Sequence, residues 1–154
     1  MTTHIFLLLL CAGAVSLAEA QSRPAAPTSS SRNAALRAEI QAVNDSMVAA
    51  FNRGDMMAVA RFYTDDARVD GERGALVQGR EAVDKYWAGI RNAKSWKLEV
   101  LAVGGHRDHP WQAGRSTLVQ SGSQGDQVSV VEFLAVWRRD AKGGLRLAVD
   151  YYRY

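Results

Sequence analysis

The sequence predicts a single α+β domain, with helices packed on one face of an antiparallel sheet. Apolar residues recur at helical spacing in the first half of the folded region and alternate at strand spacing in the second half. The period changes at about Ala93. Helices followed by strands favour an α+β arrangement over alternating βαβ units.

Three helices are expected in the first half. The first begins at about Asn33, and Gly54 suits the position just beyond its end. The second is short, with Asp55 as its N-cap and an apolar side that includes Phe62 and Tyr63. The third begins near Arg80. The apolar positions are Leu36, Ile40, Val43, Met47, Ala50 and Phe51 in the first helix and Val83, Tyr86, Trp87 and Ile90 in the third.

The strands are expected mainly after the helices. A short strand over Ala67 to Asp70 precedes a turn at Gly71-Glu72-Arg73-Gly74. A long strand follows Ala93 and ends at Gly104-Gly105. Further strands are expected at about 111–121, 127–139 and 145–152, and residues 140–144 form the hairpin loop between the last two. This spacing favours consecutive antiparallel hairpins.

The N-terminus predicts export. Ile5 to Val15 is an apolar run followed by Ala18-Glu19-Ala20, as in a secretory signal peptide. The run is shorter than the ~20 residues of a spanning helix. We therefore expect a signal at 1–20, a Pro/Ser-rich tether at 21–32 and the domain at 33–154, periplasmic or secreted and without a membrane span after cleavage. The alternatives are a retained anchor and a lipid-modified Cys11, which the large Leu10 disfavours.

Composition excludes several classes of site. Cys11 is the only cysteine, so the cleaved chain has no disulfide, thiolate metal site or cysteine nucleophile. The basic residues are spread along the chain without a nucleic-acid-binding motif, and we expect neither a nucleic-acid partner nor a cofactor. His106-Arg107-Asp108-His109 lacks a distant ligand, so we interpret it as a solvated loop and predict no metal site.

Three segments resemble the nuclear transport factor 2-like (SnoaL-like) superfamily. They are Ala50-Phe51-Asn52-Arg53-Gly54-Asp55 with Phe62-Tyr63-Thr64-Asp65-Asp66-Ala67, then Gly79-Arg80-Glu81-Ala82-Val83, and Val136-Trp137-Arg138-Arg139-Asp140 through Leu147. The resemblance implies a cone, in which three N-terminal helices pack on the concave face of a curved, antiparallel or mixed sheet and leave a pocket. It also implies a homodimer formed through the sheet. The superfamily includes steroid isomerases, polyketide cyclases, dehydratases and members without demonstrated activity, so fold alone does not give function.

The steroid isomerase comparison fails at the catalytic positions. The position of the tyrosine that holds the oxyanion falls on Met47, and that of the general-base aspartate falls on Gly71. Any acid–base chemistry must then use another carboxylate.

Three carboxylates are candidate bases, because an apolar pocket would raise their pKa values toward working pH. Glu132 lies in the most apolar strand, and Asp150 lies in the last strand. Asp70 ends the first strand. The alternatives are an ion pair with Arg115 or Arg146 for Glu132, an edge or interface ion pair for Asp150 and a turn position for Asp70.

Aromatic residues supply the expected pocket wall: Tyr63, Tyr86, Trp87, Trp137 and Tyr152. Such a wall favours a small apolar ligand with a few polar groups. We therefore predict an exported binding module for such a ligand. The first alternative is an isomerase, cyclase or dehydratase with Tyr63, Tyr86 or Tyr152 as proton donor, and the second is a structural dimerisation module. The sequence does not decide whether the domain is an enzyme.

Overall fold

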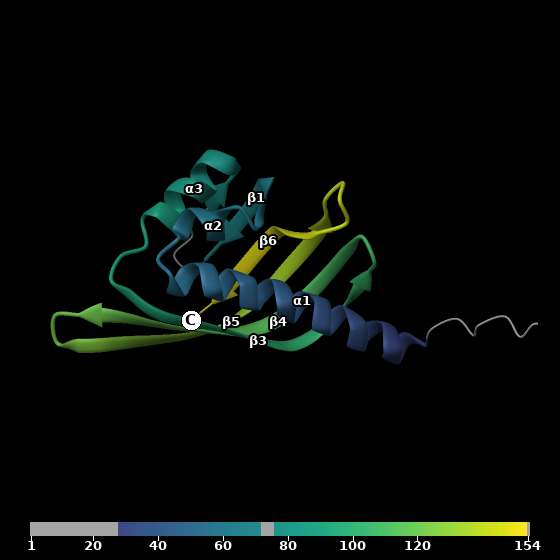
Figure 1. Cartoon of the computed structure of the whole chain (residues 1–154), viewed down its shortest axis with the longest axis horizontal. Helices are drawn as coiled ribbons and strands as arrows, with labels where there is room; N and C mark the ends of the chain where they lie inside the picture. The colour runs from purple at the N-terminus through teal and green to yellow at the C-terminus, as the bar shows by residue number, and fades with distance from the viewer. Residues whose placement is uncertain (1–27, 72–75, 154) are drawn as a thin grey trace, which may run out of the picture.

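A six-stranded mixed sheet and three helices make up the fold (Figure 1). The computed structural model describes residues 28–71 and 76–153. The strand order is β2-β1-β6-β5-β4-β3, and the sheet stays open. The predicted α+β class is confirmed. The elements are α1 (Ser29–Asn52), α2 (Met56–Ala60), β1 (Tyr63–Asp70), β2 (Leu76–Gln78), α3 (Arg80–Ala88), β3 (Ala93–His106), β4 (His109–Gly122), β5 (Gly125–Arg139) and β6 (Leu145–Arg153).

The long strands β3 to β6 form consecutive antiparallel hairpins, as predicted. β6 then lies parallel to β1, and β1 pairs with β2 in antiparallel fashion. Register shifts after Val100 and Val136 interrupt the ladders, and such bulges bend and twist strands. Figure 1 shows α1 running across one face of the curved sheet, with α2 and α3 above one of its ends.

Helix α1 begins at Ser29, four residues before the expected start at Asn33. The Thr28 hydroxyl accepts a hydrogen bond from the backbone N–H of Ser31 at 3.2 Å and caps the helix. Residues 29–32, which were predicted to belong to the tether, are therefore helical. The helix ends where predicted, and Gly54 has a φ of 77° just beyond it.

The predicted second helix is too long. α2 ends at Ala60, and β1 already begins at Tyr63 instead of Ala67. The backbone N–H of Leu147 donates to the carbonyl of Phe62 at 2.8 Å, and Tyr63 is paired with Leu147. Pairing with β6, which is distant in sequence, thus overrides a local helical pattern and makes Tyr63 a strand residue.

The hairpins are longer than the sequence suggested. β3 continues through Gly104 and Gly105 to His106, because these residues pair with 109–111 of β4. The indole of Trp111 packs where a side chain at Gly104 would lie. β4 begins at His109, so the expected loop is a two-residue turn. The loop at 140–144 is confirmed: the Asp140 carboxylate accepts from the backbone N–H groups of Lys142 and Gly144, both at 2.9 Å.

Several predictions fall on residues outside the described ranges. These are the signal peptide at 1–20, most of the tether and the part of the turn at 72–74. Export stays a prediction of the sequence. Among the described residues, none of the helices is both long and apolar enough to cross a membrane.

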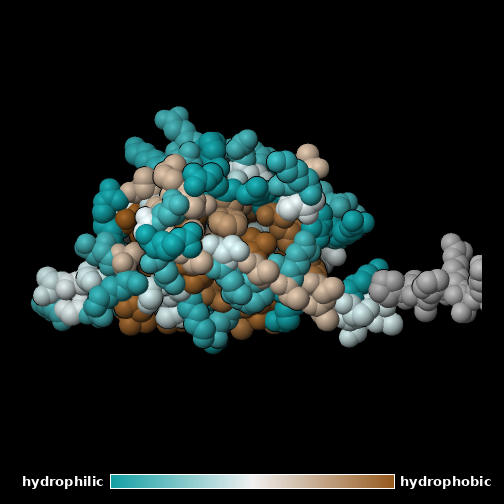
Figure 2. Space-filling view, in the orientation of Figure 1, coloured by the Kyte–Doolittle hydropathy of each residue, from teal (hydrophilic) through white to brown (hydrophobic). Residues whose placement is uncertain are grey.

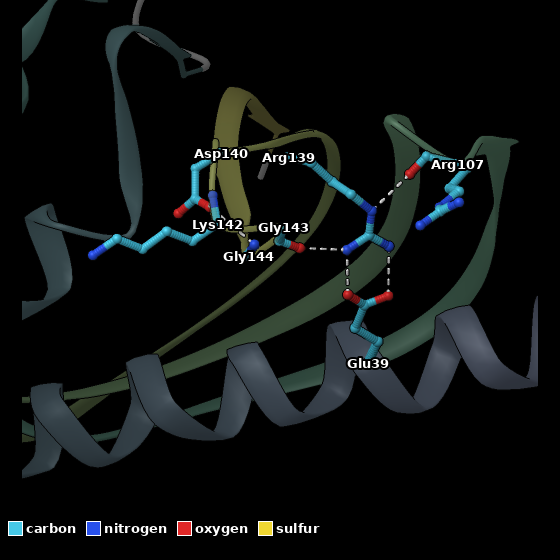
Figure 3. Close-up of polar contacts among 7 residues, drawn as sticks. All are labelled: Glu39, Arg107, Arg139, Asp140, Lys142, Gly143 and Gly144. Carbon is cyan, nitrogen blue, oxygen red and sulfur yellow. Dashed lines mark hydrogen bonds and ion pairs between the residues drawn. The ribbon is translucent and has the colours of Figure 1, made fainter.

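Arg139 ties two hairpins to α1 (Figure 3). Its guanidinium donates to both carboxylate oxygens of Glu39, at 2.5 and 2.8 Å. It also donates to the carbonyl of Arg107 in the β3–β4 turn at 3.1 Å and to that of Gly143 in the β5–β6 loop at 2.8 Å. This bidentate Arg–carboxylate pair has a fixed geometry, which positions the middle of α1 over the sheet.

Arg139→Met removes all four hydrogen bonds. We expect it to lower the free energy of unfolding by about 1–2 kcal/mol, since charge-assisted bonds are lost but Glu39 stays partly solvated. Urea unfolding at pH 7 measures the change. Arg115→Met is the matched control, because the Arg115–Glu132 pair is exposed and worth about 0.5 kcal/mol or less. Equal losses in the two variants would contradict the role assigned to Arg139.

A buried cavity and its carboxylate

Strand register decides which side chains face the helices. Directly paired residues lie on the same face of a sheet. Phe133 is paired with Tyr152, and Ala135 is paired with Asp150. Trp137 is paired with Leu147, which is in turn paired with Tyr63. These three rows lie on the inner face of the sheet, beneath α1 and α3.

A cavity of about 120 Å³ lies between this inner face and the helices. In Figure 2, hydrophobic residues are visible in the gap between α1 and the elements above it. The wall contains all five aromatic residues that were predicted to line a pocket: Tyr63, Tyr86, Trp87, Trp137 and Tyr152. A mostly apolar wall with a few polar groups is typical of a small-molecule site.

The aromatic side of the wall is tightly packed. The rings of Phe51, Trp87 and Trp96 contact one another, with centroid separations of 5.1 to 6.3 Å. The Trp96 indole donates to the Ser116 hydroxyl at 2.8 Å. The rings therefore hold one another in place, and this side of the cavity is preformed.

Asp150 brings a carboxylate into this apolar wall. The Tyr63 hydroxyl, from a residue only 3% exposed, donates to Oδ2 of Asp150 at 2.9 Å. Asp150 keeps some accessible surface, and it lines the cavity. Burial raises the pKa of Asp150 from 3.8 to about 6, while the hydrogen bond from Tyr63 holds it lower than burial alone would. Asp150 can therefore both take up and release a proton near neutral pH.

Three tyrosines line the same cavity as this carboxylate. Burial raises the pKa of Tyr63 well above its usual value, and the charge of Asp150 raises it further, so Tyr63 stays protonated. The hydroxyls of Tyr86 and Tyr152 lie 3.2 Å apart. Asp150 and Tyr152 alternate with Tyr151 on β6, so both point into the cavity.

The other two candidate carboxylates lie elsewhere. Glu132 is on the outer face of β5, where Arg115 donates to it at 3.1 Å and its side chain is 69% exposed. Asp70 receives a hydrogen bond from Arg68 at 3.0 Å and lies on the face of β1 opposite the buried Val69. Neither lines the cavity. Of the three candidates, only Asp150 can reach a molecule bound there.

The predicted loop at 106–109 is a hairpin tip. Nδ1 of His106 lies 3.6 Å from an Asp108 oxygen, and both side chains are exposed. Within the described ranges, no three His, Cys, Asp or Glu side chains are grouped as metal ligands.

Sequence reasoning missed Asn44. It lines the cavity and is 1% exposed. The spacing of the sequence identifies this position, because Asn44 lies on the apolar face of α1, four residues after Ile40 and three before Met47. A polar residue inside an apolar stripe is the pattern that would have identified it.

Comparison with known proteins agrees with this architecture. The SnoaL-like domain family matches residues 45–147. The chain belongs to the SnoaL-like family. Within the nuclear transport factor 2-like superfamily it lies in the branch related to ketosteroid isomerases. The matched region ends at Leu147, before Asp150 and Tyr152.

Relatives of this SnoaL-like chain include a steroid Delta-isomerase from Nocardioides simplex, 32% identical over 111 residues, which cover 70% of this chain and 85% of that protein. Among solved structures, a ketosteroid isomerase-like protein from Erwinia carotovora atroseptica matches with a TM-score of 0.66 at 20% identity, covering 76% and 94% of the two chains. An NTF2-like protein from Novosphingobium aromaticivorans matches with a TM-score of 0.65 at 18% identity, covering 76% and 80%. These structural likenesses show the fold.

The structure shows what surrounds the two positions at which the steroid isomerase comparison fails. Met47 lines the cavity and is 2% exposed, so it offers an apolar surface where that comparison expects a hydroxyl. Gly71 is packed against the Tyr152 ring, whose hydroxyl lies 2.7 Å from the place of a Cβ atom. A carboxylate at position 71 would require the Tyr152 ring to shift, and the carboxylate that lines this cavity is Asp150.

The raised pKa of Asp150 predicts a pH-dependent stability. The folded state holds this proton more tightly than the unfolded state, so the stabilisation is complete below pH 3.8 and is lost as the pH rises through about 6. The Asp150→Asn variant does not lose stability in this way, because its amide does not titrate. From pH 4 to pH 8, its free energy of unfolding should rise relative to that of the unmodified chain by on the order of 2 kcal/mol.

Denaturant unfolding of both proteins at several pH values measures this difference. The other carboxylates with shifted pKa values, such as Asp66 and Asp140, are present in both proteins and cancel. A constant difference across the range would show that Asp150 titrates normally.

Proposed function

We propose that this SnoaL-like protein is an acid–base enzyme that moves a proton on a small, largely apolar carbonyl compound, with Asp150 as the base. The observation that carries the proposal is a cavity carboxylate whose pKa is raised to about 6 and which is hydrogen-bonded by Tyr63. A general base works best when its pKa lies near the operating pH. The steroid Delta-isomerase relative supports an isomerisation as the reaction type.

In this mechanism ionised Asp150 takes a proton from the carbon next to the carbonyl group. The electron pair of the broken C–H bond is delocalised over the conjugated system. The resulting enolate carries negative charge on the oxygen. Protonated Asp150 then returns the proton to another carbon of the same conjugated system. The double bond has moved, and no oxidant, reductant or second substrate is needed. The hydrogen bond from Tyr63 stabilises the ionised form of the carboxylate.

Two other functions are compatible with this fold. A binding module would hold an apolar ligand without proton transfer, and a structural module would need no cavity at all. The preformed aromatic wall supports a ligand-binding role over a purely structural one. The buried carboxylate favours catalysis over simple binding, because a charge in an apolar wall weakens the binding of an apolar molecule.

Asp150→Asn tests the catalytic role. We expect turnover of small β,γ-unsaturated ketones to fall by about 100-fold or more, because the base is lost while its shape is kept. In the unmodified protein, kcat/KM should fall below about pH 6, where Asp150 is protonated. Tyr63→Phe should move this limb to higher pH, since it removes the hydrogen bond that lowers the pKa of Asp150. Ultraviolet absorption of the conjugated product follows the reaction.

Glu132→Gln and Asp70→Asn are the matched controls. Both remove a carboxylate outside the cavity and should leave turnover unchanged. If neither the unmodified protein nor any variant turns over a ketone but a ligand binds, the binding module is favoured. Loss of turnover in Glu132→Gln would transfer the role of base to that residue.

We also propose that a second copy of the chain covers the outer face of the sheet. Four hydrophobic residues are exposed there, on paired strands: Trp111, Val128, Val130 and Leu134, which we name the outer patch. Val130 is 53% exposed and Val128 is 62% exposed. The exposed Arg115–Glu132 ion pair lies on the same face, between Val130 and Leu134. Exposed apolar surface flanked by polar residues is typical of an interface, and a two-fold axis lets one patch meet its copy.

Val130→Asp places a charge in the outer patch. We expect it to convert a dimer into a monomer, because two desolvated carboxylates would meet near the axis. Sedimentation velocity on both proteins measures the mass. Met57→Asp is the matched control, as Met57 is an exposed hydrophobic residue on α2, away from the outer patch. A monomeric unmodified protein, or a dimeric Val130→Asp protein, would refute this interface.

A further inference from the structure

Two hydrogen-bond donors in the cavity wall lack acceptors. Nδ2 of Asn44 and Nε1 of Trp137 are buried, and neither has a hydrogen-bond partner within the described part of the chain. Both residues line the cavity, and each is only 1% exposed. Buried polar groups in folded proteins almost always have partners, so each unpaired donor calls for an explanation.

These donors come from opposite walls of the cavity. Asn44 lies on α1, between Ile40 and Met47 on the buried face. Trp137 lies on β5, two residues after Ala135, the residue paired with Asp150. Helix and sheet therefore each contribute a residue with an unpaired N–H group to the wall of the cavity that Asp150 also lines.

Other buried donors do not share this arrangement. Nε1 of Trp87 is also buried in the cavity wall without a hydrogen bond of normal geometry, but this indole faces the Tyr63 hydroxyl and lowers the pKa of that group. Both amide atoms of Gln112 are unpaired as well, yet Gln112 does not line the cavity. Asn44 and Trp137 are thus the donors among these four residues that a bound molecule can satisfy.

We propose that Asn44 and Trp137 bind the carbonyl oxygen of the substrate. This assignment rests on the proposed function and names the substrate class as a neutral ketone or aldehyde. A hydrocarbon would leave both donors unpaired, and a cation would be repelled by their N–H groups. When Asp150 removes a proton, negative charge moves to this oxygen, where preorganised donors stabilise it most strongly. Asn44 therefore supplies the donor that Met47, one turn later on the same face, does not.

Two ligands of nearly equal shape test the assignment. Acetophenone carries a C=O group where isopropenylbenzene carries C=CH2, so the two differ little in size. Ligand-detected NMR titration gives the dissociation constants. In Asn44→Leu, which removes the amide and keeps the size, acetophenone should bind about tenfold more weakly relative to isopropenylbenzene. Gln112→Leu is the matched control, and it should leave this ratio unchanged.

The carbonyl stretching frequency of bound acetophenone gives a second readout, independent of affinity. Infrared difference spectra with a ¹³C-labelled carbonyl should show a lowered frequency in the unmodified protein, because N–H donors weaken the C=O bond. The frequency should rise in Asn44→Leu and in Trp137→Phe. An unchanged frequency in both variants overturns the assignment, as does an equal loss of affinity for the two ligands.

This experiment separates the two proposals, since it does not measure turnover. A carbonyl shift that depends on Asn44, in a protein that turns over no ketone, would leave the donor assignment standing and refute the proposed reaction. Turnover that depends on Asp150, without any effect of Asn44→Leu on acetophenone, would refute the donor assignment alone.

Discussion

The hydrogen bond between Tyr63 and Asp150 links the fold of this protein to its chemistry. A carboxylate in an apolar wall is costly to ionise, and one hydroxyl donor offsets only part of that cost. The pair exists because β1 and β6, far apart in sequence, run parallel and side by side. The aromatic rings and α1 then enclose the pair and keep water from solvating it freely. Without the enclosure, Asp150 would be an ordinary acidic residue.

The cavity wall combines tightly packed aromatic rings with unpaired hydrogen-bond donors. Phe51, Trp87 and Trp96 pack against one another and leave little freedom to rearrange. Asn44 and Trp137 keep donors without acceptors, which lowers the stability of the fold. Unpaired buried donors of this kind occur at sites that bind or react, where a ligand supplies the missing acceptor. The Arg139 clamp lies outside the cavity and holds α1 over it, so stability is supplied away from the chemistry.

The site differs from the pattern that the steroid isomerase comparison predicts, although the fold is shared. Position 71 is glycine because the Tyr152 ring occupies the space beside it, and position 47 is an apolar methionine. The groups that we propose to act on the substrate therefore come from β6 and from another turn of α1. A cone that buries one apolar cavity can place a carboxylate on several of its strands, which is why one fold serves many reactions.

The sequence alone determined the α+β class, the three helices, the consecutive hairpins and the aromatic residues of the cavity, since each depends on local periodicity and turn residues. It could not determine where β1 begins, because Tyr63 is a strand residue only through its pairing with Leu147. It also left three carboxylates equivalent. Tertiary structure distinguished them: strand register sends Asp150 inward and Glu132 outward, and a shift of one residue reverses the face of a side chain. Burial, and with it the pKa, is a property of that register and of the helices above it.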